Sequence, residues 1–252
     1  MSAGTLASPI QHEPGLRGQT VLVIGGSAGI GLETARRARA EGADLILVGR
    51  DENRLDRAAG ELGAQSTAAF DATDFERLAR FFNELSTPID HVMVTGPGPY
   101  YAPLAEFDVG KARQAFEAHL LLAIEIARNA ASKVRPGGSL LFMTGTGGRR
   151  PTAGALIAAL TAATPALVRA LAFEIAPVRV NSIAAGFVDT PLSASLLGDR
   201  LEARREHLRE TLPIRRVVGP ADIGALAVHL MTNTAITGAT YDIDGGQQLV
   251  DH

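Results

Sequence analysis

The chain of 252 residues is 46% hydrophobic and 20% charged, which is typical of a globular protein with a large core. Its formal net charge of −3 produces no field that would attract nucleic acid or an anionic membrane. It has no cysteine, which excludes disulfides, thiolate nucleophiles and cysteine-ligated metals, and its histidines show no metal-ligand spacing. We therefore predict no metal site and no nucleic-acid or membrane partner.

Residues 1–17 are polar and contain two prolines, so we predict a flexible N-terminal arm and no signal peptide. Residues 18–252 alternate short apolar runs with helical patterns and contain no linker, which predicts one domain. The predicted strands are Thr20–Ile24, Asp44–Val48, Ser66–Phe70, His91–Thr95, Ser139–Thr144, Arg179–Ile183 and Ala239–Ile243. The predicted helices are residues 29–41, 51–62, 74–85, 108–134, 152–176 and 219–231.

The strand segments are apolar on both faces, as expected when helices cover both sides of a parallel sheet. This alternation predicts an α/β fold, a Rossmann-type doubly wound parallel sheet of about seven strands. Ligands bind outside the carboxyl ends of the strands in such folds. The charged, helical segment 191–213, inserted between the last two strands, is therefore a candidate cover for a substrate.

The segment Pro151–Val168 contains no charged residue, which is compatible with a membrane-spanning helix. Pro165, the nearby threonines and the following Arg169 and Glu174 argue against a span, and the many alanines favour packing on another helix. We therefore expect a buried or interfacial helix and a cytoplasmic protein.

The most specific motif is the glycine loop Gly25-Gly26-Ser27-Ala28-Gly29-Ile30-Gly31, between the first strand and the first helix. Gly25 permits a tight turn, Gly29 lets the backbone approach a pyrophosphate, and Gly31 lets the helix lie close to the sheet. The N–H groups and dipole of the helix terminus would bind the anion. The alternative is a glycine-rich turn that binds no cofactor.

With this loop, the sequence resembles the short-chain dehydrogenase/reductase family from about residue 18 to residue 250. Further matches are Phe70-Asp71-Ala72-Thr73-Asp74, Arg179-Val180-Asn181, Gly186-Phe187-Val188-Asp189-Thr190 and Ile243-Asp244-Gly245-Gly246. The resemblance implies a nicotinamide cofactor. It also implies that Asp71 and Ala72 contact the adenine, and that Val188 and Thr190 contact the nicotinamide carboxamide or the phosphates.

The end of the second strand, Val48-Gly49-Arg50-Asp51, bears on the choice of cofactor. A carboxylate at this place favours NAD, whereas a cation favours the 2′-phosphate of NADP. Arg50 supplies the cation, so we predict NADP rather than NAD; alternatively Gly49-Arg50 is only a turn and Asp51 a helix N-cap. The predicted cofactor-binding residues are Gly25, Ser27, Gly29, Ile30, Gly31, Arg50, Asp71, Ala72, Thr95, Gly96, Gly186, Val188 and Thr190.

The resemblance also implies how a carbonyl oxygen is protonated during hydride transfer. A tyrosine donates the proton, a lysine four residues later lowers its pKa, a serine polarises the carbonyl and an asparagine supports a water relay. This chain has only two lysines, and the residues four positions before Lys111 and Lys133 are Phe107 and Asn129. No Tyr-x-x-x-Lys sequence therefore occurs.

Alignment backwards from Arg179-Val180-Asn181 places Leu160 and Thr164 at the tyrosine and lysine positions. His119 falls at the asparagine position and Gly145 at the serine position. The cofactor half of the site thus matches the family, and the proton-transfer half does not.

Three residues are candidates for the missing chemistry. His119 titrates near neutral pH and is a candidate general acid; the alternative is a buried or interface histidine. Thr144 is placed to polarise a carbonyl, or only to hydrogen-bond at a strand end. Tyr100, after the fourth strand, would supply a phenol, or only pack in the core or a lid.

We predict an NADP(H)-dependent oxidoreductase that transfers hydride to or from a small carbonyl compound or alcohol through a non-standard acid/base site. The alternative is a catalytically inactive NADP(H)-binding protein that acts as a sensor or partner. The resemblance also implies a homo-oligomer, a tetramer or dimer, formed through helices 108–134 and 152–176.

Overall fold

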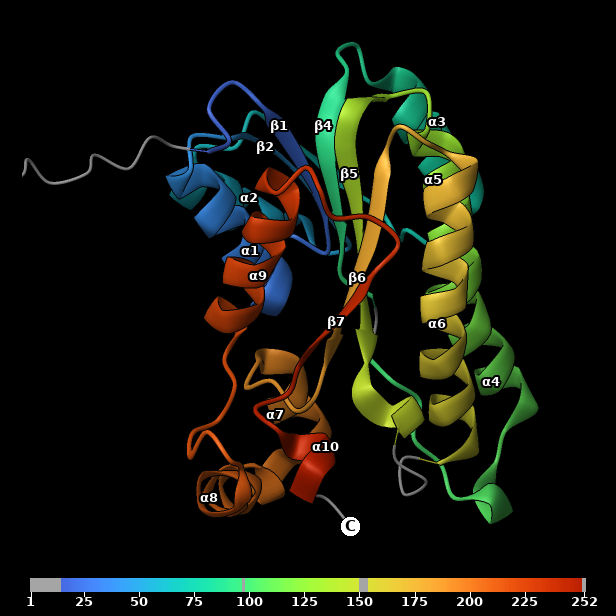
Figure 1. Cartoon of the computed structure of the whole chain (residues 1–252), viewed down its shortest axis with the longest axis vertical. Helices are drawn as coiled ribbons and strands as arrows, with labels where there is room; N and C mark the ends of the chain where they lie inside the picture. Colours follow the sequence, from blue (N-terminus) through green and yellow to red (C-terminus); the bar gives the residue numbers. More distant parts are fainter. Residues whose placement is uncertain (1–14, 97, 150–153, 251–252) are drawn as a thin grey trace, which may run out of the picture.

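The computed structural model describes residues 15–96, 98–149 and 154–250. Its strands form one parallel seven-stranded sheet in the order β3-β2-β1-β4-β5-β6-β7 (Figure 1). The strands are β1 (Thr20–Ile24), β2 (Asp44–Gly49), β3 (Ser66–Ala69), β4 (Ile89–Val94), β5 (Val134–Gly145), β6 (Arg179–Ala185) and β7 (Thr240–Ile243). The order reverses between β1 and β4, where doubly wound folds bind ligands, so the predicted fold class is confirmed.

Helices cover both faces of the sheet (Figure 1). One face carries α1 (Gly29–Ala40), α2 (Glu52–Leu62) and α9 (Pro220–Thr232), and the other carries α3 (Phe75–Glu84), α5 (Leu122–Ala130) and α6 (Ala155–Glu174). In β1, Leu22 and Ile24 enter the core beneath α3, α5 and α6, whereas Val21 and Val23 enter the core beneath α1 and α9. This alternation explains why the strand is apolar at every position.

Several predicted boundaries were wrong; for example, β5 begins at Val134 and not at Ser139. The helix predicted over residues 108–134 is divided into α4 (Val109–Phe116) and α5 by a π-helical turn, Glu117–Leu121. The predicted N-terminal arm, residues 1–17, includes residues that belong to the domain. Leu16 is fully buried, and its N–H donates to the carbonyl of Glu41. Residues 15–17 are therefore part of the domain; the rest of the predicted arm lies outside the described residues.

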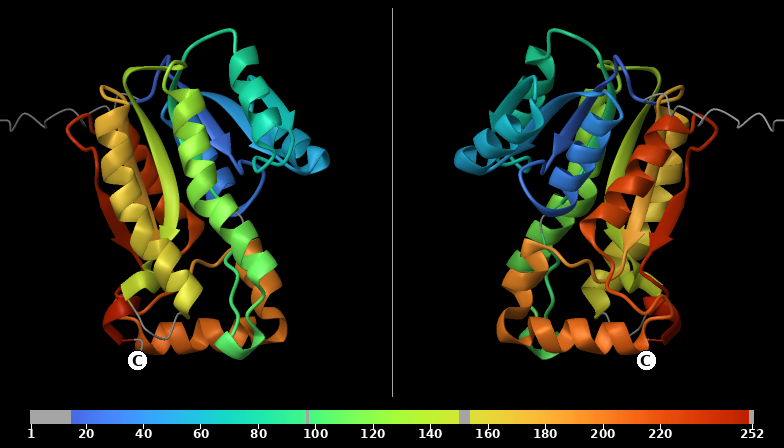
Figure 2. Two further views of the ribbon diagram at one scale, coloured as in Figure 1. Left: turned by 90° about the vertical axis from the view of Figure 1, so that its right-hand side faces the viewer. Right: turned by 90° about the vertical axis from the view of Figure 1, so that its left-hand side faces the viewer.

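The segment predicted as a substrate cover forms α7 (Pro191–Leu197), a short 3-10 turn and α8 (Leu201–Thr211). These helices lie at the end of the molecule where the strands have their carboxyl ends, and α8 runs across that end (Figure 2). The Arg205 guanidinium donates two hydrogen bonds to Asp189, at 3.0 and 2.8 Å. This pair ties α8 to the loop that follows β6.

Helix α6 is long and apolar enough to cross a membrane by length and composition alone. One of its faces, which includes Leu160, Val168 and Leu171, is buried against the sheet. The opposite face exposes alanines, and the helix ends beside an exposed Phe173. The helix therefore has one buried face, as one of the two predicted alternatives requires, and one exposed face.

A buried arginine joins the start of β6 to the end of α9. The Arg179 guanidinium donates hydrogen bonds to the carbonyl oxygens of Leu230 (2.7 Å), Met231 (2.7 Å), Asn233 (3.1 Å) and Ile236 (3.2 Å). The last carbonyls of a helix have no partner within the helix and lie at the negative end of its dipole. Arg179 therefore satisfies groups that would otherwise be buried without a hydrogen bond.

Replacement of this arginine by methionine should lower the free energy of unfolding by about 3 kcal/mol, because several buried carbonyls lose their donor. Urea denaturation of Arg179→Met measures the loss. Arg128→Met is the control, since Arg128 is 65% exposed and, among the described residues, forms an ion pair with Glu125 alone. The loss in this control should be below about 1 kcal/mol. Equal losses in the two variants would contradict this role of Arg179.

Candidate active site

The glycine loop forms the tight turn that the sequence predicts. Gly25 has a φ of +87°, and a Cβ atom there would overlap Thr95. A Cβ on Gly31 would overlap the carbonyl oxygen of Gly25. Thr95 Oγ1 donates to the carbonyl oxygens of Ile24 (3.1 Å) and Gly25 (3.3 Å), which fastens the turn to the end of β4. Only glycine fits these two positions.

Helix α1 begins at Gly29, and its N-cap residue, Ala28, offers no side-chain hydrogen bond. No acidic side chain lies in the first turn of the helix. The backbone N–H groups of this turn are therefore directed to the loop, at the positive end of the helix dipole. This cradle fits the pyrophosphate of a dinucleotide.

The ends of β2 and β3 form the next part of the site. Ser27 lies beside Gly49, since a Cβ on Gly49 would be 3.2 Å from the Ser27 hydroxyl oxygen. Arg50 Nη1 lies 4.0 Å from Asp71 Oδ2, and the Arg50 side chain is 73% exposed. Partial burial opposes ionisation of Asp71, but the hydrogen bonds from Thr73 and the charge of Arg50 outweigh it and lower the pKa of this carboxyl.

Asp51 accepts a hydrogen bond from the N–H of Arg54 and caps α2, as the alternative interpretation of this segment predicts. Arg50 remains exposed beside the site while Asp51 caps α2. The N-cap role of Asp51 and the predicted cofactor contact of Arg50 are therefore compatible. Of the other predicted contacts, Ile30 packs against the core on the α1 face, and Ala72 packs against the core on the opposite face.

The loop after β6 approaches the glycine loop from the other side. A Cβ on Gly29 would lie 3.6 Å from Thr190 Cβ, and Thr190 accepts a hydrogen bond from the N–H of Ser193 at the start of α7. Val188 is buried and forms a bridge with Val218. A Cβ on Gly186 would lie 2.6 Å from Asp244 and Gln247. Gly186 and Val188 thus shape the loop, and Thr190 joins it to the glycine turn.

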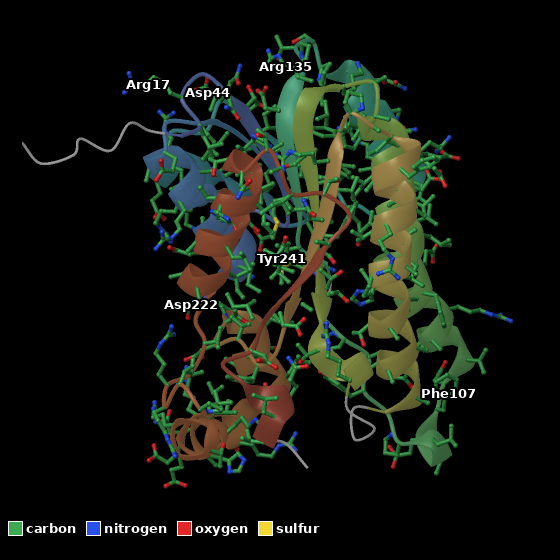
Figure 3. All side chains as sticks on the ribbon, in the orientation of Figure 1. Arg17, Asp44, Phe107, Arg135, Asp222 and Tyr241 are labelled. Atoms are coloured by element: carbon green, nitrogen blue, oxygen red, sulfur yellow. The ribbon has the colours of Figure 1, made fainter. Side chains whose placement is uncertain are left out.

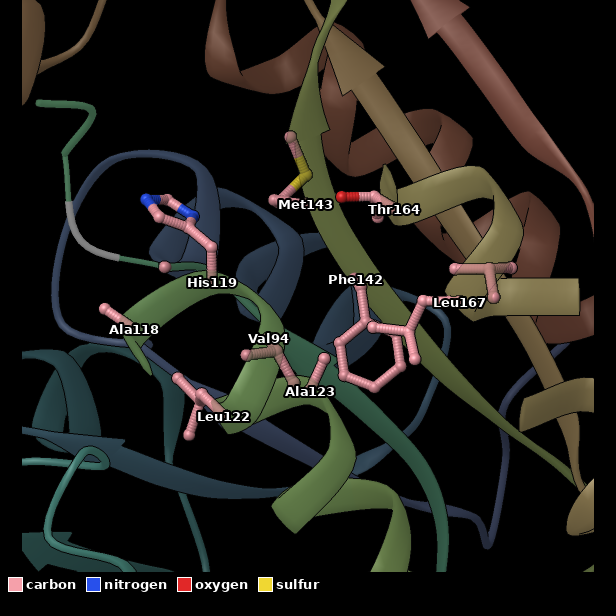
Figure 4. A pocket seen from close by; sticks show the side chains of 11 residues that line it. Val94, Ala118, His119, Leu122, Ala123, Phe142, Met143, Thr164 and Leu167 are labelled. Atoms are coloured by element: carbon pink, nitrogen blue, oxygen red, sulfur yellow. The ribbon is translucent and has the colours of Figure 1, made fainter. Parts of the chain in front are cut away.

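His119 projects from the π-helical turn toward the loop after β4. A Cβ on Gly96 would lie 3.6 Å from His119 Nδ1, so the ring packs on a bare backbone. The ring lines a cavity of about 20 Å³, enough for one water molecule, with Thr164 and Met143 on the facing wall (Figure 4). Since Gly96 follows Thr95, this cavity adjoins the glycine turn.

Burial lowers the pKa of His119 below its usual value of 6.5, and the hydrogen bond with Gly98 raises it by less. The neutral form of the ring is therefore favoured more strongly than in a free imidazole. A neutral imidazole accepts a proton, whereas the predicted general acid must first be protonated.

The other two catalytic candidates are engaged in local contacts. Thr144 donates its hydroxyl proton to Thr164 (3.2 Å), which in turn donates to the carbonyl of Leu160 (3.0 Å). Thr144 therefore has no proton left to polarise a carbonyl. The Tyr100 hydroxyl accepts a hydrogen bond from the N–H of Asp108 (3.0 Å) at the start of α4. This arrangement agrees with the alternative roles that the sequence left open for Thr144 and Tyr100.

The remaining tyrosines and lysines also lie elsewhere. Tyr101 is 63% exposed, and Tyr241 of β7 packs against the core on the α9 side of the sheet. Phe107, which precedes α4, has its ring 6.4 Å from that of Tyr100 (Figure 3). Lys111 lies over the Tyr100 ring, and Lys133 donates to backbone carbonyls near the end of α3. None of these residues lines the cavity beside His119.

The face of α6 that meets the end of β5 carries no tyrosine or lysine. Leu160 and Thr164 are both buried. Thr161 is the residue of α6 that lies closest to Gly145, since a Cβ on Gly145 would be 3.4 Å from the methyl group of Thr161. Ile157 lies one turn before Thr161 in the helix. In the part of the chain that the structure describes, no group of three or more histidine, aspartate or glutamate side chains is placed to hold a metal ion.

A family model described as Enoyl-(Acyl carrier protein) reductase matches residues 25–248. The galactitol 2-dehydrogenase (L-tagatose-forming) of Cereibacter sphaeroides is 34% identical over 92% of this chain and 95% of its own. The MalC reductase/Diels-Alderase of Malbranchea aurantiaca has the same fold, with a TM-score of 0.87 at 24% identity over 94% and 99% of the two chains. BdcA, solved in complex with NADPH, has a TM-score of 0.83 at 26% identity over 94% and 98%.

Substitution of Gly31 by alanine should weaken NADPH binding at least about tenfold, because the added Cβ overlaps the carbonyl of Gly25 and opens the turn. Calorimetric titration of the folded variant with NADPH measures the change. Gly60→Ala in α2 is the control, since a Cβ there meets nothing within 4 Å. Unchanged affinity in Gly31→Ala would place the dinucleotide elsewhere.

Proposed function

Because the chain belongs to the short-chain dehydrogenase/reductase family, we propose that it is an NADP(H)-dependent oxidoreductase with His119 as its proton-transfer group. The substrate is an alcohol or carbonyl compound, and the family's tyrosine–lysine pair has no part in the reaction. The observation that carries this proposal is the place of His119, which packs on the bare backbone of Gly96 beside a one-water cavity that adjoins the glycine turn.

The preference for NADP(H) rests on Arg50. Its guanidinium lies at the end of β2, where a cation would pair with a 2′-phosphate. Among the described residues, Asp71 is the only acidic side chain that forms an ion pair with Arg50. The NADPH complex of BdcA, a protein of similar fold, supports the same cofactor.

When bound, the nicotinamide supplies or accepts the hydride. In alcohol oxidation, His119 accepts the hydroxyl proton as the hydride leaves the carbon, directly or through one water in the cavity. The contact with Gly96 limits the orientations that the ring can take. In carbonyl reduction the same nitrogen must first be protonated, so a lower pH favours carbonyl reduction. The similarity to a galactitol dehydrogenase makes polyols the first substrates to test.

Replacement of the base should separate catalysis from cofactor binding. We expect the unmodified protein to reduce NADP⁺ with a polyol or another alcohol. In His119→Gln, kcat should fall about 100-fold, while the affinity for NADPH should stay unchanged. Steady-state kinetics on a panel of polyols, alcohols, aldehydes and ketones, together with calorimetric titration, measures both. A normal kcat in His119→Gln would remove His119 from the mechanism.

Alcohol oxidation should be constant at neutral pH and should fall as the pH drops through the pKa of His119, which lies below 6.5. The sign follows because the protonated ring no longer accepts a proton. Profiles of kcat between about pH 5 and pH 8 measure this limb. Its persistence in His119→Gln would assign the limb to another group.

A second candidate function is NADP(H) binding without turnover, in which the loaded protein acts as a sensor or partner. It is favoured by the absence of tyrosine and lysine from the wall of the cavity beside His119. NADPH binding with no oxidation or reduction of cofactor across the substrate panel would establish it and overturn the enzyme proposal.

We also propose that the chain forms a homo-oligomer through α6 and the α4–α5 region. Phe173 is 87% exposed, Ala166 lies on the exposed face of α6, and Leu121 and Ile124 are exposed on the neighbouring segment. Ala166→Arg should therefore give a smaller particle in sedimentation equilibrium, because a charge would be buried between copies. Gly60→Arg on α2 is the control; a monomeric unmodified chain would contradict the proposal.

A further inference from the structure

The loop of residues 186–190, which joins β6 to α7, reaches the glycine turn through its last residue. Within the loop, Val188 forms a bridge with Val218, and the N–H of Asp189 donates to the carbonyl of Val218 at 2.9 Å. Thr190 lies against the start of α1, since a Cβ on Gly29 would be 3.6 Å from Thr190 Cβ. Only one peptide bond therefore separates Asp189 from the residue that meets the glycine turn.

The side chain of Asp189 is bound by an arginine from a different element. Arg205 of α8 donates from Nε to Asp189 Oδ2 at 3.0 Å and from Nη2 to Asp189 Oδ1 at 2.8 Å. Two parallel hydrogen bonds between a guanidinium and a carboxylate fix the orientation of the pair as well as its distance. The remaining nitrogen, Nη1, donates to Glu202 at 3.1 Å, one turn earlier in α8, and this bond holds the guanidinium in place.

The Arg205–Asp189 pair is more buried than a neighbouring ion pair of α8. The side chains of Arg205 and Asp189 are 29% and 31% exposed, whereas those of Arg209 and Glu206 are 45% and 61% exposed. Solvent and salt therefore screen the Arg205–Asp189 pair less. The two pairs also differ in what they join, because Arg209 pairs with Glu202 and Glu206 of its own helix, whereas Arg205 reaches the 186–190 loop.

Helix α8, which crosses the end of the molecule where the strands have their carboxyl ends, is itself anchored (Figure 2). Leu208, near the end of the helix, is 1% exposed. Just beyond the helix, Pro213 packs on the loop after β7, since a Cβ on Gly246 would lie 2.6 Å from Pro213. Because α8 is fixed in this way, its arginine can hold Asp189 in one position.

We propose that Arg205 is a positioning residue for the cofactor: it holds Asp189, and thereby Thr190, against the start of α1, where the dinucleotide is proposed to bind. This inference rests on the proposed function, because it concerns the same cofactor site. Without the Arg205 side chain, the 186–190 loop loses its attachment to α8, Thr190 moves more freely, and the cofactor binds more weakly.

The test is a double-mutant cycle on NADPH affinity, measured by calorimetric titration of Arg205→Met, Asp189→Asn and the double variant. Arg205→Met should weaken NADPH binding about fivefold, the effect of losing one partly exposed ion pair. Asp189→Asn should weaken it by a similar factor, and the double variant by no more than either single change, because each change removes the same pair. Arg205→Lys, which keeps the charge but not the two parallel bonds, should recover only part of the loss.

The matched control is Arg209→Met, since Arg209 lies one turn along α8 and pairs with Glu202 and Glu206 instead. This variant should bind NADPH like the unmodified protein. Hydrogen exchange without cofactor gives a second measurement, because the Asp189 amide is bonded to the carbonyl of Val218. This amide should exchange faster in Arg205→Met but not in Arg209→Met.

Unchanged affinity in folded Arg205→Met, or equal losses in Arg205→Met and Arg209→Met, would overturn the inference. Losses that add in the double variant would show that Arg205 does not act through Asp189. Restored affinity in the double variant would show that only the charge of Asp189 matters, and would equally contradict a positioning role. If the unmodified protein binds no NADPH, the proposed function fails together with the cofactor role of Arg205, and the exchange of the Asp189 amide still decides whether Arg205 holds the loop.

Discussion

The burial of the His119 ring beside the glycine turn is the feature on which the proposed proton transfer depends. The ring packs on the bare backbone of Gly96 and lines a cavity with room for one water molecule. Burial keeps the ring neutral, since the charged form is the one that loses hydration. A carboxylate or a lysine in its place would carry a charge at neutral pH, whereas this histidine changes charge over a small range of pH.

The two halves of the site rely on different physical features. The cofactor half is built from backbone: positive φ at Gly25, close approach at Gly31, and a helix terminus without a side-chain cap. The proton-transfer half is built from side chains carried by separate elements. Because positioning of the reactants supplies much of the barrier reduction in hydride transfer, a base weaker than a lysine-assisted tyrosine is compatible with turnover.

Most of the fold could be predicted because its signals are local. The bounds of β1 are confirmed, since an apolar run of that length between polar residues is typical of a central parallel strand. The glycine loop could be predicted as well, because few residues other than glycine tolerate its φ angles and contacts. By contrast, the π-helical turn that carries His119 was missed, because its residues continue the helical pattern of their neighbours.

The contacts that decide the chemistry were not visible in the sequence. Thr144 was a candidate to polarise a carbonyl until the structure placed Thr164 beside it as the acceptor of its proton. His119 was recognisable as a titratable residue, but no pattern indicates that its ring packs on the backbone of Gly96. Such pairings are set by tertiary packing between distant segments, for which a single sequence carries no signal.

The central claim, that burial keeps His119 a neutral base, is tested most directly by the nitrogen chemical shifts of its ring at pH 7. We expect one protonated and one unprotonated nitrogen. Two protonated nitrogens would contradict the claim.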